Sequence, residues 1–381
     1  MVTRIVIIGG GPAGYEAAIV AATAHPESVQ VTVIDSDGIG GAAVLDDCVP
    51  SKTFIASTGL RTELRRAQRL GFDIDIDDAK ISLPQIHARV KALAAEQSAD
   101  ITAQLLGMGV HVIAGRAELI DPTPGLARHR VKATHSDSGP DGPVSSEHDA
   151  DVVLIATGAS PRELPSARPD GERILTWRQL YDLEALPQHL IVVGSGVTGA
   201  EFVHAYTEFG VQVTVVASRD RVLPYEDADA ALVLEESFAE RGVRLVKNAR
   251  AESVTRTDTG VLVTMTDGRT VEGSHALMTI GSVPNTGAWA WNGSASSSGP
   301  ATTSLWTGCR GRRFPASTPP ATAPGCCRWR RSPRCRAGSR CITRWARVSA
   351  RSGCARSRRR CSPGPRSPPS GCRSRRSTTG R

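Results

Sequence analysis

The sequence has 381 residues, which is enough for two or three domains of ordinary size. It has no uncharged apolar run near the ~20 residues of a membrane-spanning helix, and no clear cleavage site follows its apolar start. We therefore expect a cytoplasmic protein without a membrane span. Residues 1–285 hold all 38 acidic side chains and 25 of the 46 Lys and Arg, whereas residues 286–381 hold 21 Arg and no acid. The formal net charge of +8 describes neither part.

The N-terminal segment has the pattern of a dinucleotide-binding unit. Residues 4–22, RIVIIGGGPAGYEAAIVAA, predict a buried strand, a glycine turn and an Ala-rich helix, and the next strand, VQVTVID, ends in Asp35. At this spacing Gly9 allows the tight turn, Gly11 lets backbone amides approach a pyrophosphate, and Gly14 permits close helix–strand packing. Asp35 can accept a hydrogen bond from a ribose hydroxyl. The alternative, a glycine-rich turn without a ligand, is disfavoured because strand, helix and acid occur together.

A second copy of this pattern spans residues 189–218, HLIVVGSGVTGAEFVHAYTEFGVQVTVVAS. Gly194, Gly196 and Gly199 repeat the glycine spacing after another apolar strand. Two dinucleotides are therefore implied. The expected fold class is α/β with two Rossmann-like dinucleotide-binding domains.

The second copy differs from the first where its second strand ends. Ala217 and Ser218 occupy the region in which an NAD-preferring site usually has a carboxylate. No acid there would repel a 2′-phosphate, and Arg219 could pair with one, so the pattern permits NADPH. The alternative is that Arg219 is a solvated surface residue.

The remaining residues predict further elements of an α/β fold. Residues 82–109 have the length and composition of a long helix. The polar segment 135–146 is expected to be a loop. Residues 275–286, HALMTIGSVPNT, predict a strand that leads into a Gly–Pro–Asn turn. Two other segments read as strands, at residues 110–120 and 151–165.

The motifs GGGPAG, PSK, ATGASP, GSGVTGAE and TIGSVPN follow one another in this order. Their order resembles the flavoprotein disulfide reductase family, which includes lipoamide dehydrogenase, glutathione reductase and mercuric reductase. The resemblance implies FAD in the first fingerprint, NAD(P)H in the second, and hydride transfer from nicotinamide to flavin. We expect an FAD-binding domain at 1–165, an NAD(P)H-binding domain at 166–285 and an aberrant tail at 286–381.

The same resemblance assigns residues to the cofactors. Thr157 and Gly158 are expected where the chain passes between the two nucleotide domains. Lys52 and Glu201 are expected to pair near the reactive edge of the isoalloxazine, as candidate catalytic residues. The other positions implied to bind a cofactor are Pro12, Ala13, Ala114, Val197, Thr198 and Gly281.

The segment Gly40–Lys52, GGAAVLDDCVPSK, departs from the family's redox motif, which typically reads GGTCLNVGCIPSK. Cys48 matches the second thiol of that motif, but Ala43 replaces the first. No disulfide can form within the motif, so electrons cannot be relayed through one. By the resemblance Cys48 sits beside the flavin and is a candidate catalytic residue, although we favour an inert buried thiol.

A flavin reduced by NAD(P)H can still pass electrons directly to an acceptor, which describes a diaphorase. With Ala43 in place of Cys, the pattern resembles the lipoamide-dehydrogenase-like NAD(P)H:quinone reductases. The expected function is therefore FAD-dependent reduction of a quinone-like small molecule by NAD(P)H. The alternative within the family is a dihydrolipoamide dehydrogenase-type disulfide reductase, which Ala43 disfavours.

The tail departs from the family pattern, which should continue to GIYAAGD, whose Asp binds the FAD ribitol, and then to a C-terminal dimerisation domain. Residues 286–381 are instead rich in Arg, Ser, Pro and Cys and lack regular periodicity, so we expect disorder. One permitted back-translation of Ala316–Ala323, read in the neighbouring frame, gives GIYAAGDC. We therefore expect a frameshift near Thr286–Ala288, and an impaired chain without the domain that forms the family's homodimer.

Nucleic-acid binding is the alternative from a different class of function. It rests on the 21 Arg and five Trp of the tail, which could contact phosphates and stack on bases. The tail has no CxxC pair, no His and no recognised RNA-binding signature, so we expect neither a nucleic-acid partner nor a metal. The expected partners are FAD, NAD(P)H and a small-molecule acceptor.

Overall fold

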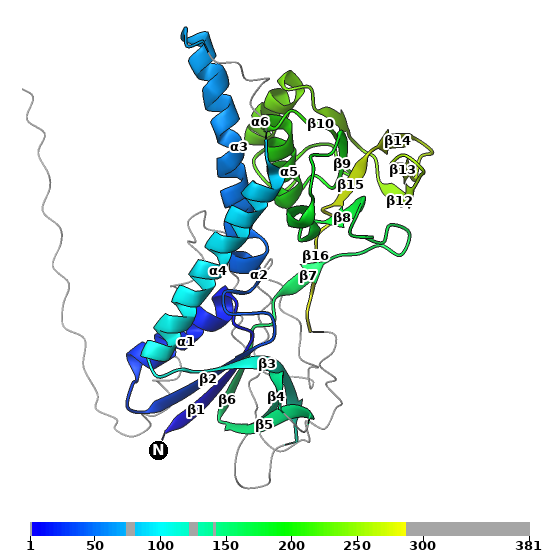
Figure 1. Cartoon of the computed structure of the whole chain (residues 1–381). Coiled ribbons are helices and arrows are strands. Elements are labelled where there is room, and N and C mark those ends of the chain that lie inside the picture. The colour runs from blue at the N-terminus through cyan, green and yellow to red at the C-terminus, as the bar shows by residue number, and fades with distance from the viewer. Residues whose placement is uncertain (1, 74–80, 122–128, 140–141, 287–381) are drawn as a thin grey trace, which may run out of the picture. The chain divides into compact units, whose positions relative to one another are not determined.

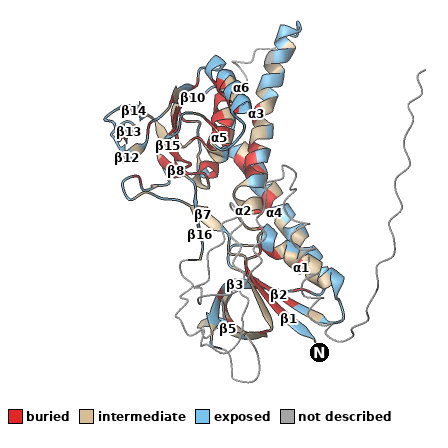
Figure 2. Cartoon of the chain, turned by 180° about the vertical axis from the view of Figure 1, so that it is seen from behind, coloured by how far each residue is buried: buried red, intermediate tan, exposed pale blue. Residues whose placement is uncertain are grey.

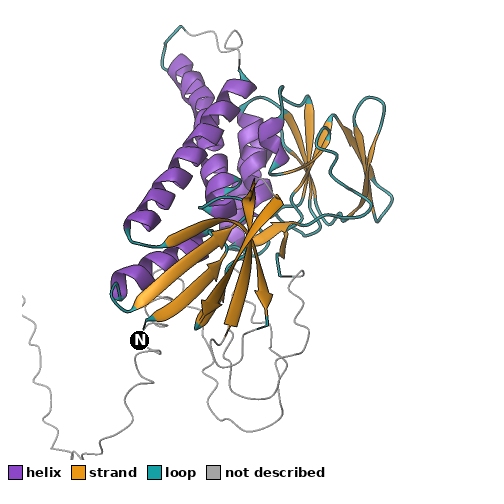
Figure 3. Cartoon of the chain, turned by 60° about the horizontal axis from the view of Figure 1, so that its bottom comes forward, coloured by secondary structure: helices purple, strands orange, loops and turns teal. Residues whose placement is uncertain are grey.

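The chain has an α/β fold built on two sheets whose central strands are parallel (Figure 1). The computed structural model describes residues 2–73, 81–121, 129–139 and 142–286. Figure 3 shows the strands of these sheets in orange and the helices in purple. The predicted frameshift and disorder concern positions that lie outside the described residues, apart from Thr286.

The first sheet has the strand order β5-β4-β3-β2-β1-β6. β1 is parallel to both β2 and β6, and β2 is parallel to β3. Helix α1, Pro12–Ala24, connects β1 to β2, so these three elements form the first predicted nucleotide-binding unit. The strands are β1 Thr3–Ile8, β2 Val29–Asp35, β3 His111–Ile120, β4 His129–Gly139, β5 Gly142–Ala150 and β6 Val152–Ile155.

The apolar run of β1 is explained by burial on both faces of the sheet (Figure 2). Ile5 and Ile7 pack in one cluster with Ala18 of α1, and Val6 and Ile8 pack in a second cluster. A central parallel strand is covered on both sides, so it reads as a continuous hydrophobic run rather than an alternating one. This arrangement fixes the glycine turn at the carboxyl end of β1.

The prediction of a polar loop at residues 135–146 is wrong. Residues 135–139 continue β4, and β5 begins at Gly142, so the described part of this segment belongs to an antiparallel strand pair. The pair buries Val131, Ala133 and Ala150 on one face and leaves polar side chains on the other. Half-exposed antiparallel strands tolerate polar residues such as Ser and Asp on the solvent side, so composition alone misled the prediction.

The second sheet is parallel throughout, in the order β11-β10-β9-β15-β8. Helix α5, Val197–Glu208, connects β9 to β10 and completes the second predicted nucleotide-binding unit. The strands are β8 Ile174–Thr176, β9 His189–Val193, β10 Gln212–Val216, β11 Arg244–Val246 and β15 His275–Met278. The other elements here are the 3₁₀ helix η1 Gln179–Asp182, helix α6 Ala228–Glu240, and the antiparallel strands β12 Ala251–Arg256, β13 Val261–Met265 and β14 Thr270–Gly273.

A short antiparallel pair, β7 Ala159–Pro161 and β16 Ser282–Pro284, brings together the two segments that follow β6 and β15. The Gly–Pro–Asn segment, expected as a turn, therefore contributes a strand. Val283 pairs with Ser160 at the centre of this register.

Within the described residues three α-helices lie between the two predicted nucleotide-binding units in sequence: α2 Gly41–Leu45, α3 Cys48–Arg69 and α4 Leu83–Gly107. The predicted long helix corresponds to α4, whereas α3 was not predicted. Phe54 of α3 and Leu83 of α4 pack in the same core as Phe202 and Tyr206 of α5. No helix in the described ranges is both long and apolar enough to cross a membrane.

Candidate cofactor and redox site

The first glycine turn has the geometry that its spacing predicts. Gly9 has φ +105°, a region that residues with a Cβ rarely adopt, and a Cβ added there would collide with the Ala156 carbonyl. A Cβ on Gly14 would collide with the carbonyl oxygen of Gly9, so only glycine allows α1 to lie this close to the turn. Among the described residues a Cβ on Gly11 would meet Gly41 Cα alone, at 3.8 Å, so these residues leave the backbone at Gly11 open. Pro12 and Ala13 are the first residues of α1.

Asp35 organises the loop beneath this turn. Its carboxylate accepts hydrogen bonds from the backbone amides of Gly10 and Gly38, both at 2.6 Å, and of Asp37 at 2.8 Å. Each carboxylate oxygen has more than one lone pair, so these bonds are compatible with a ribose hydroxyl as a further donor. Ala114 of β3 lies beside Asp35 in register and is exposed.

A second glycine cluster, Gly38, Gly40 and Gly41, contributes to the same region and was missed by motif reading. All three have positive φ, and the amide of Gly40 donates to the carbonyl of Gly10 at 2.8 Å. A Cβ on Gly41 would lie 2.7 Å from Gly11 Cα, so the backbone of this glycine cluster lies against the backbone of the first glycine turn. The sequence GIGG was the available signal, because Gly clusters mark positive φ and close backbone approach.

The second fingerprint repeats the first position by position. Gly194 has φ +118°, and its added Cβ would collide with the carbonyl of Thr279, as that of Gly9 would with Ala156. An added Cβ on Gly199 would lie 2.5 Å from the carbonyl oxygen of Gly194, and one on Gly196 would meet no described residue within 4 Å. Val197 and Thr198 open helix α5. Both turns therefore present an open backbone at the helix N-terminus, which suits a pyrophosphate.

The end of β10 carries the positions predicted to discriminate between the two nicotinamide cofactors. Ala217 is buried, whereas Ser218 and Arg219 are exposed. The Arg219 carbonyl accepts a hydrogen bond from the Asn248 amide at 3.0 Å, which fixes its backbone. Within the described residues no carboxylate pairs with the Arg219 guanidinium, so its charge is available to a ligand.

Thr157 and Gly158 lie at the crossing between β6 and β7, where Asn285 binds them. Asn285 Nδ2 donates to the Thr157 carbonyl, and the Asn285 amide donates to the Gly158 carbonyl, both at 3.0 Å. Thr157 Oγ1 donates to the Asn285 carbonyl, and Ser160 Oγ donates to Asn285 Oδ1 at 2.8 Å. Gly281, at φ +99°, accepts a hydrogen bond from the Arg162 amide. Asn285 is thus a positioning residue that sequence reasoning quoted but did not assign.

The structure brings Lys52 of α3 and Glu201 of α5 together across 149 positions of sequence. Lys52 Nζ donates to Glu201 Oε1 at 2.7 Å, and Ser51 Oγ donates to Glu201 Oε2 at 3.4 Å. The Lys52 side chain is 59% exposed and that of Glu201 only 24%. The carboxylate therefore anchors an ammonium group that remains open to a ligand on its other side.

The interpretation of Cys48 as a buried thiol is wrong, because Cys48 is exposed and is not in a disulfide. It is the first residue of α3, so its side chain lies at the helix end rather than within the core. Ala43 lies in α2, the short helix that precedes it. The segment holds one accessible thiol and a methyl group where the family motif has two thiols.

Two acids next to Cys48 were also not assigned from the sequence. Asp46 forms an ion pair with Arg178 Nε at 3.1 Å. Burial, and next the charge of Glu201, raise the pKa of Asp47 above its ordinary value. Tyr181 of η1 is nearby and almost fully buried, and its hydroxyl has no hydrogen-bond partner in the described part of the chain.

Comparison with known proteins agrees with this geometry. The family model described as pyridine nucleotide-disulphide oxidoreductase matches residues 3–295. The chain belongs to this family.

Within the pyridine nucleotide-disulphide oxidoreductase family, the chain is similar to proteins of more than one activity. It is 85% identical over 286 residues to "NAD(P)H dehydrogenase (quinone)" of Mycobacterium tuberculosis, which covers 75% of this chain and 57% of that protein. It is 31% identical over 288 residues to a dihydrolipoyl dehydrogenase of Zymomonas mobilis, covering 74% of this chain and 58% of the relative. The chain thus matches somewhat more than half the length of these curated relatives.

Solved structures support the same fold. The crystal structure of LpdA from Mycobacterium tuberculosis superimposes with a TM-score of 0.71 at 82% sequence identity, covering 76% of this chain and 61% of that one. A flavoprotein disulfide reductase, RclA from Escherichia coli, gives a TM-score of 0.60 at 22% identity, which bears on the fold alone.

The residues present fit the cofactors of this family. Two glycine turns, each open at Gly11 or Gly196 and each placed at a helix N-terminus, provide two diphosphate cradles that a Cβ would partly fill. Asp35 lies at the end of β2, where a ribose is expected, and Lys52 offers an exposed ammonium group close to the redox motif. The predicted ribitol-binding segment lies outside the described residues.

Proposed function

We propose that this chain is the nucleotide-binding part of an FAD-dependent NAD(P)H:quinone oxidoreductase that uses no redox disulfide. The observation that carries the proposal is the pairing of Lys52 with Glu201 beside a motif in which Ala43 replaces one of two thiols. The residues expected to act on a flavin, Lys52 and Glu201, are present as a pair. The dithiol that would exchange with a disulfide substrate lacks one of its two thiols.

In this proposal each group of residues has one task. The turns at Gly9–Gly14 and Gly194–Gly199 bind the diphosphates of FAD and NAD(P)H. Lys52, held by Glu201, would place a positive charge near the reactive edge of a bound isoalloxazine, and Asn285 fixes the crossing at Thr157 and Gly158. Bound flavin supplies hydride transfer from NAD(P)H to the acceptor. The high-identity relative named a quinone dehydrogenase supports a quinone-like acceptor over lipoamide.

Substitution of Cys48 tests whether electrons need this thiol. Without a second thiol in the motif, hydride can reach the acceptor through the flavin alone. We expect Cys48→Ala to change the kcat for benzoquinone by less than about threefold when FAD is in excess. Near-complete loss of turnover, with FAD still bound, would instead assign Cys48 a catalytic role.

Arg219 supports NADPH as a nicotinamide substrate, because its guanidinium is exposed and no carboxylate precedes it at the end of β10. We expect Arg219→Ala to raise the KM for NADPH about tenfold through loss of a charge-assisted hydrogen bond to the 2′-phosphate. The KM for NADH, which lacks that phosphate, is the internal control. An equal change for both cofactors would place Arg219 outside the phosphate site.

The cytoplasmic location and the family's homodimer remain predictions. The tail on which the nucleic-acid alternative rests lies outside the described residues. Salt-dependent binding of nucleic acid by the 381-residue chain would be the result that revives that alternative.

A further inference from the structure

The redox segment has gained two acids where it has lost a thiol. The family motif reads LNVG at the positions where this chain has VLDD, so Asp46 and Asp47 directly precede Cys48. Together with Glu201 they form what we call the carboxylate cluster, three acids of which Asp46 and Glu201 both act electrostatically on Asp47, while Lys52 pairs with Glu201. A carboxylate of this cluster that lacks an ion-pair or hydrogen-bond partner is the one able to act on a ligand.

Two of the three carboxylates have partners. Asp46 pairs with Arg178 at 3.1 Å, and Glu201 accepts from Lys52 at 2.7 Å and from Ser51 at 3.4 Å. Asp47 occupies the N-cap position of α3, where Asp normally accepts a backbone hydrogen bond, yet its side chain makes no such bond. Within the described residues the Asp47 carboxylate also has no ion pair within 4.0 Å.

The surroundings of Asp47 raise the pKa of its carboxyl above the ordinary value for Asp. Burial raises its pKa most, followed by the negative charge of Glu201, while Lys52 lowers it, Asp46 raises it and Arg178 lowers it. Tyr181 also faces this cluster, is only 6% exposed and has an unpartnered hydroxyl. Burial and the charge of Asp47 raise the pKa of Tyr181, so the phenol stays neutral and can donate a hydrogen bond but is a poor acid.

We propose that Asp47 is the proton donor that completes reduction of the acceptor at this site, an inference that rests on the proposed quinone reductase function. Reduction of a quinone to a hydroquinone takes one hydride and one proton. The hydride comes from NAD(P)H by way of the bound flavin, which leaves NAD(P)⁺. The proton leaves the Asp47 carboxyl for the quinone oxygen, and water returns a proton to the partly exposed carboxylate.

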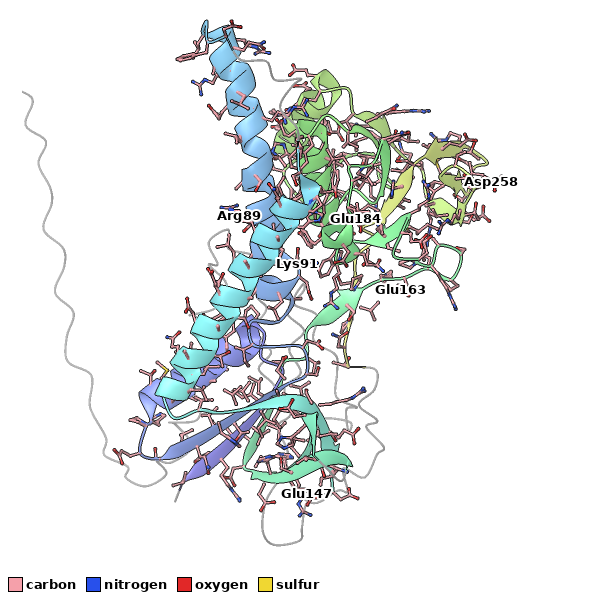
Figure 4. The ribbon with its side chains drawn as sticks, viewed as in Figure 1. Arg89, Lys91, Glu147, Glu163, Glu184 and Asp258 are labelled. Carbon is pink, nitrogen blue, oxygen red and sulfur yellow. The ribbon has the colours of Figure 1, made fainter. Side chains whose placement is uncertain are left out.

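The first experiment compares two acceptors on the 381-residue chain with FAD in excess. Benzoquinone needs a proton, whereas ferricyanide takes single electrons and no proton. We expect Asp47→Asn to lower benzoquinone turnover about 100-fold and to change ferricyanide turnover less than about threefold. Asp47→Glu should restore much of the benzoquinone rate, because it returns a carboxyl group. Asp258→Asn, in the exposed turn between β12 and β13 (Figure 4), is the matched control and should alter neither rate.

The second experiment uses unfolding and is independent of turnover. Because folding raises the pKa of Asp47, ionisation of the carboxyl costs folding stability as the pH rises through the folded-state pKa. Asp47→Asn keeps the position neutral, so its urea midpoint should exceed that of the unsubstituted chain above neutral pH. The two midpoints should converge at acidic pH, and Asp258→Asn should show no such trend.

The outcomes separate this inference from the function on which it rests. Equal loss of benzoquinone and ferricyanide turnover in Asp47→Asn would overturn the proton-donor role, as would an unchanged benzoquinone rate. A parallel pH dependence of the two urea midpoints would also overturn it. Absence of turnover with both acceptors in the unsubstituted chain, with FAD shown to be bound, would instead refute the proposed function, and the donor role with it.

Discussion

Lipoamide and glutathione disulfide should not be reduced by the chain when it is supplied with NAD(P)H and excess FAD, while benzoquinone should be. Disulfide reduction requires a thiolate to attack the substrate sulfur and a second thiol to resolve the mixed disulfide. The motif here contains Cys48 alone, because Ala43 occupies the first thiol position in α2. The check is NAD(P)H oxidation followed with each acceptor in turn.

The matched variant for this prediction is Ala43→Cys, which supplies the missing thiol at its place in the motif. We expect the unsubstituted chain to remain inactive on lipoamide whether or not this variant gains activity. Turnover of a disulfide by the unsubstituted chain would show that the dithiol is not required and would contradict the prediction.

Purified 381-residue protein should retain little FAD, whereas the same gene with its frame restored near codons 286–288 should retain FAD at close to one per chain. We propose this because the family holds FAD with two separated segments, the N-terminal fingerprint and a later GD segment. In this chain the second is replaced by Pro315–Ala323, which has no carboxylate. Loss of a charge-assisted hydrogen bond to the ribitol costs on the order of 1.5–3 kcal/mol.

The measurement is the ratio of flavin absorbance to protein after gel filtration of both proteins. Weakened affinity can be overcome by mass action, so the activity experiments above use excess FAD. Near-stoichiometric FAD in the 381-residue protein after gel filtration would contradict both the proposed frameshift and the role given to the missing segment. Resequencing across codons 280–290 tests the frameshift independently.

Features that depend on local backbone geometry could be predicted from the sequence. Gly9, Gly14 and Gly194 occupy positions where a Cβ would collide with a neighbouring carbonyl. Because only glycine fits there, the spacing of the glycines can be recognised in the sequence. The strand–helix–strand order around each turn follows equally from apolar runs buried on both sheet faces. These features predicted both strand–turn–helix–strand units that the structure contains.

Features that depend on tertiary surroundings could not be predicted in this way. The exposure of Cys48 depends on its place at the start of α3, and the segment 135–146 is a strand pair because only one of its faces is buried. Asp47 belongs to no recognised motif, and its pKa is raised by burial and then by the charge of Glu201, a residue far away in sequence. Asn285 likewise acquires its role only when β16 pairs with β7.

The absence of a redox disulfide is tested most directly by counting electrons. A flavin accepts two electrons, and a protein disulfide would accept two more, so an anaerobic dithionite titration distinguishes the two arrangements. With FAD bound, we expect full reduction after about two electrons per flavin, followed by complete reoxidation on addition of one equivalent of benzoquinone. Uptake of about four electrons per flavin would show a second redox centre in the chain and would contradict direct transfer from flavin to acceptor.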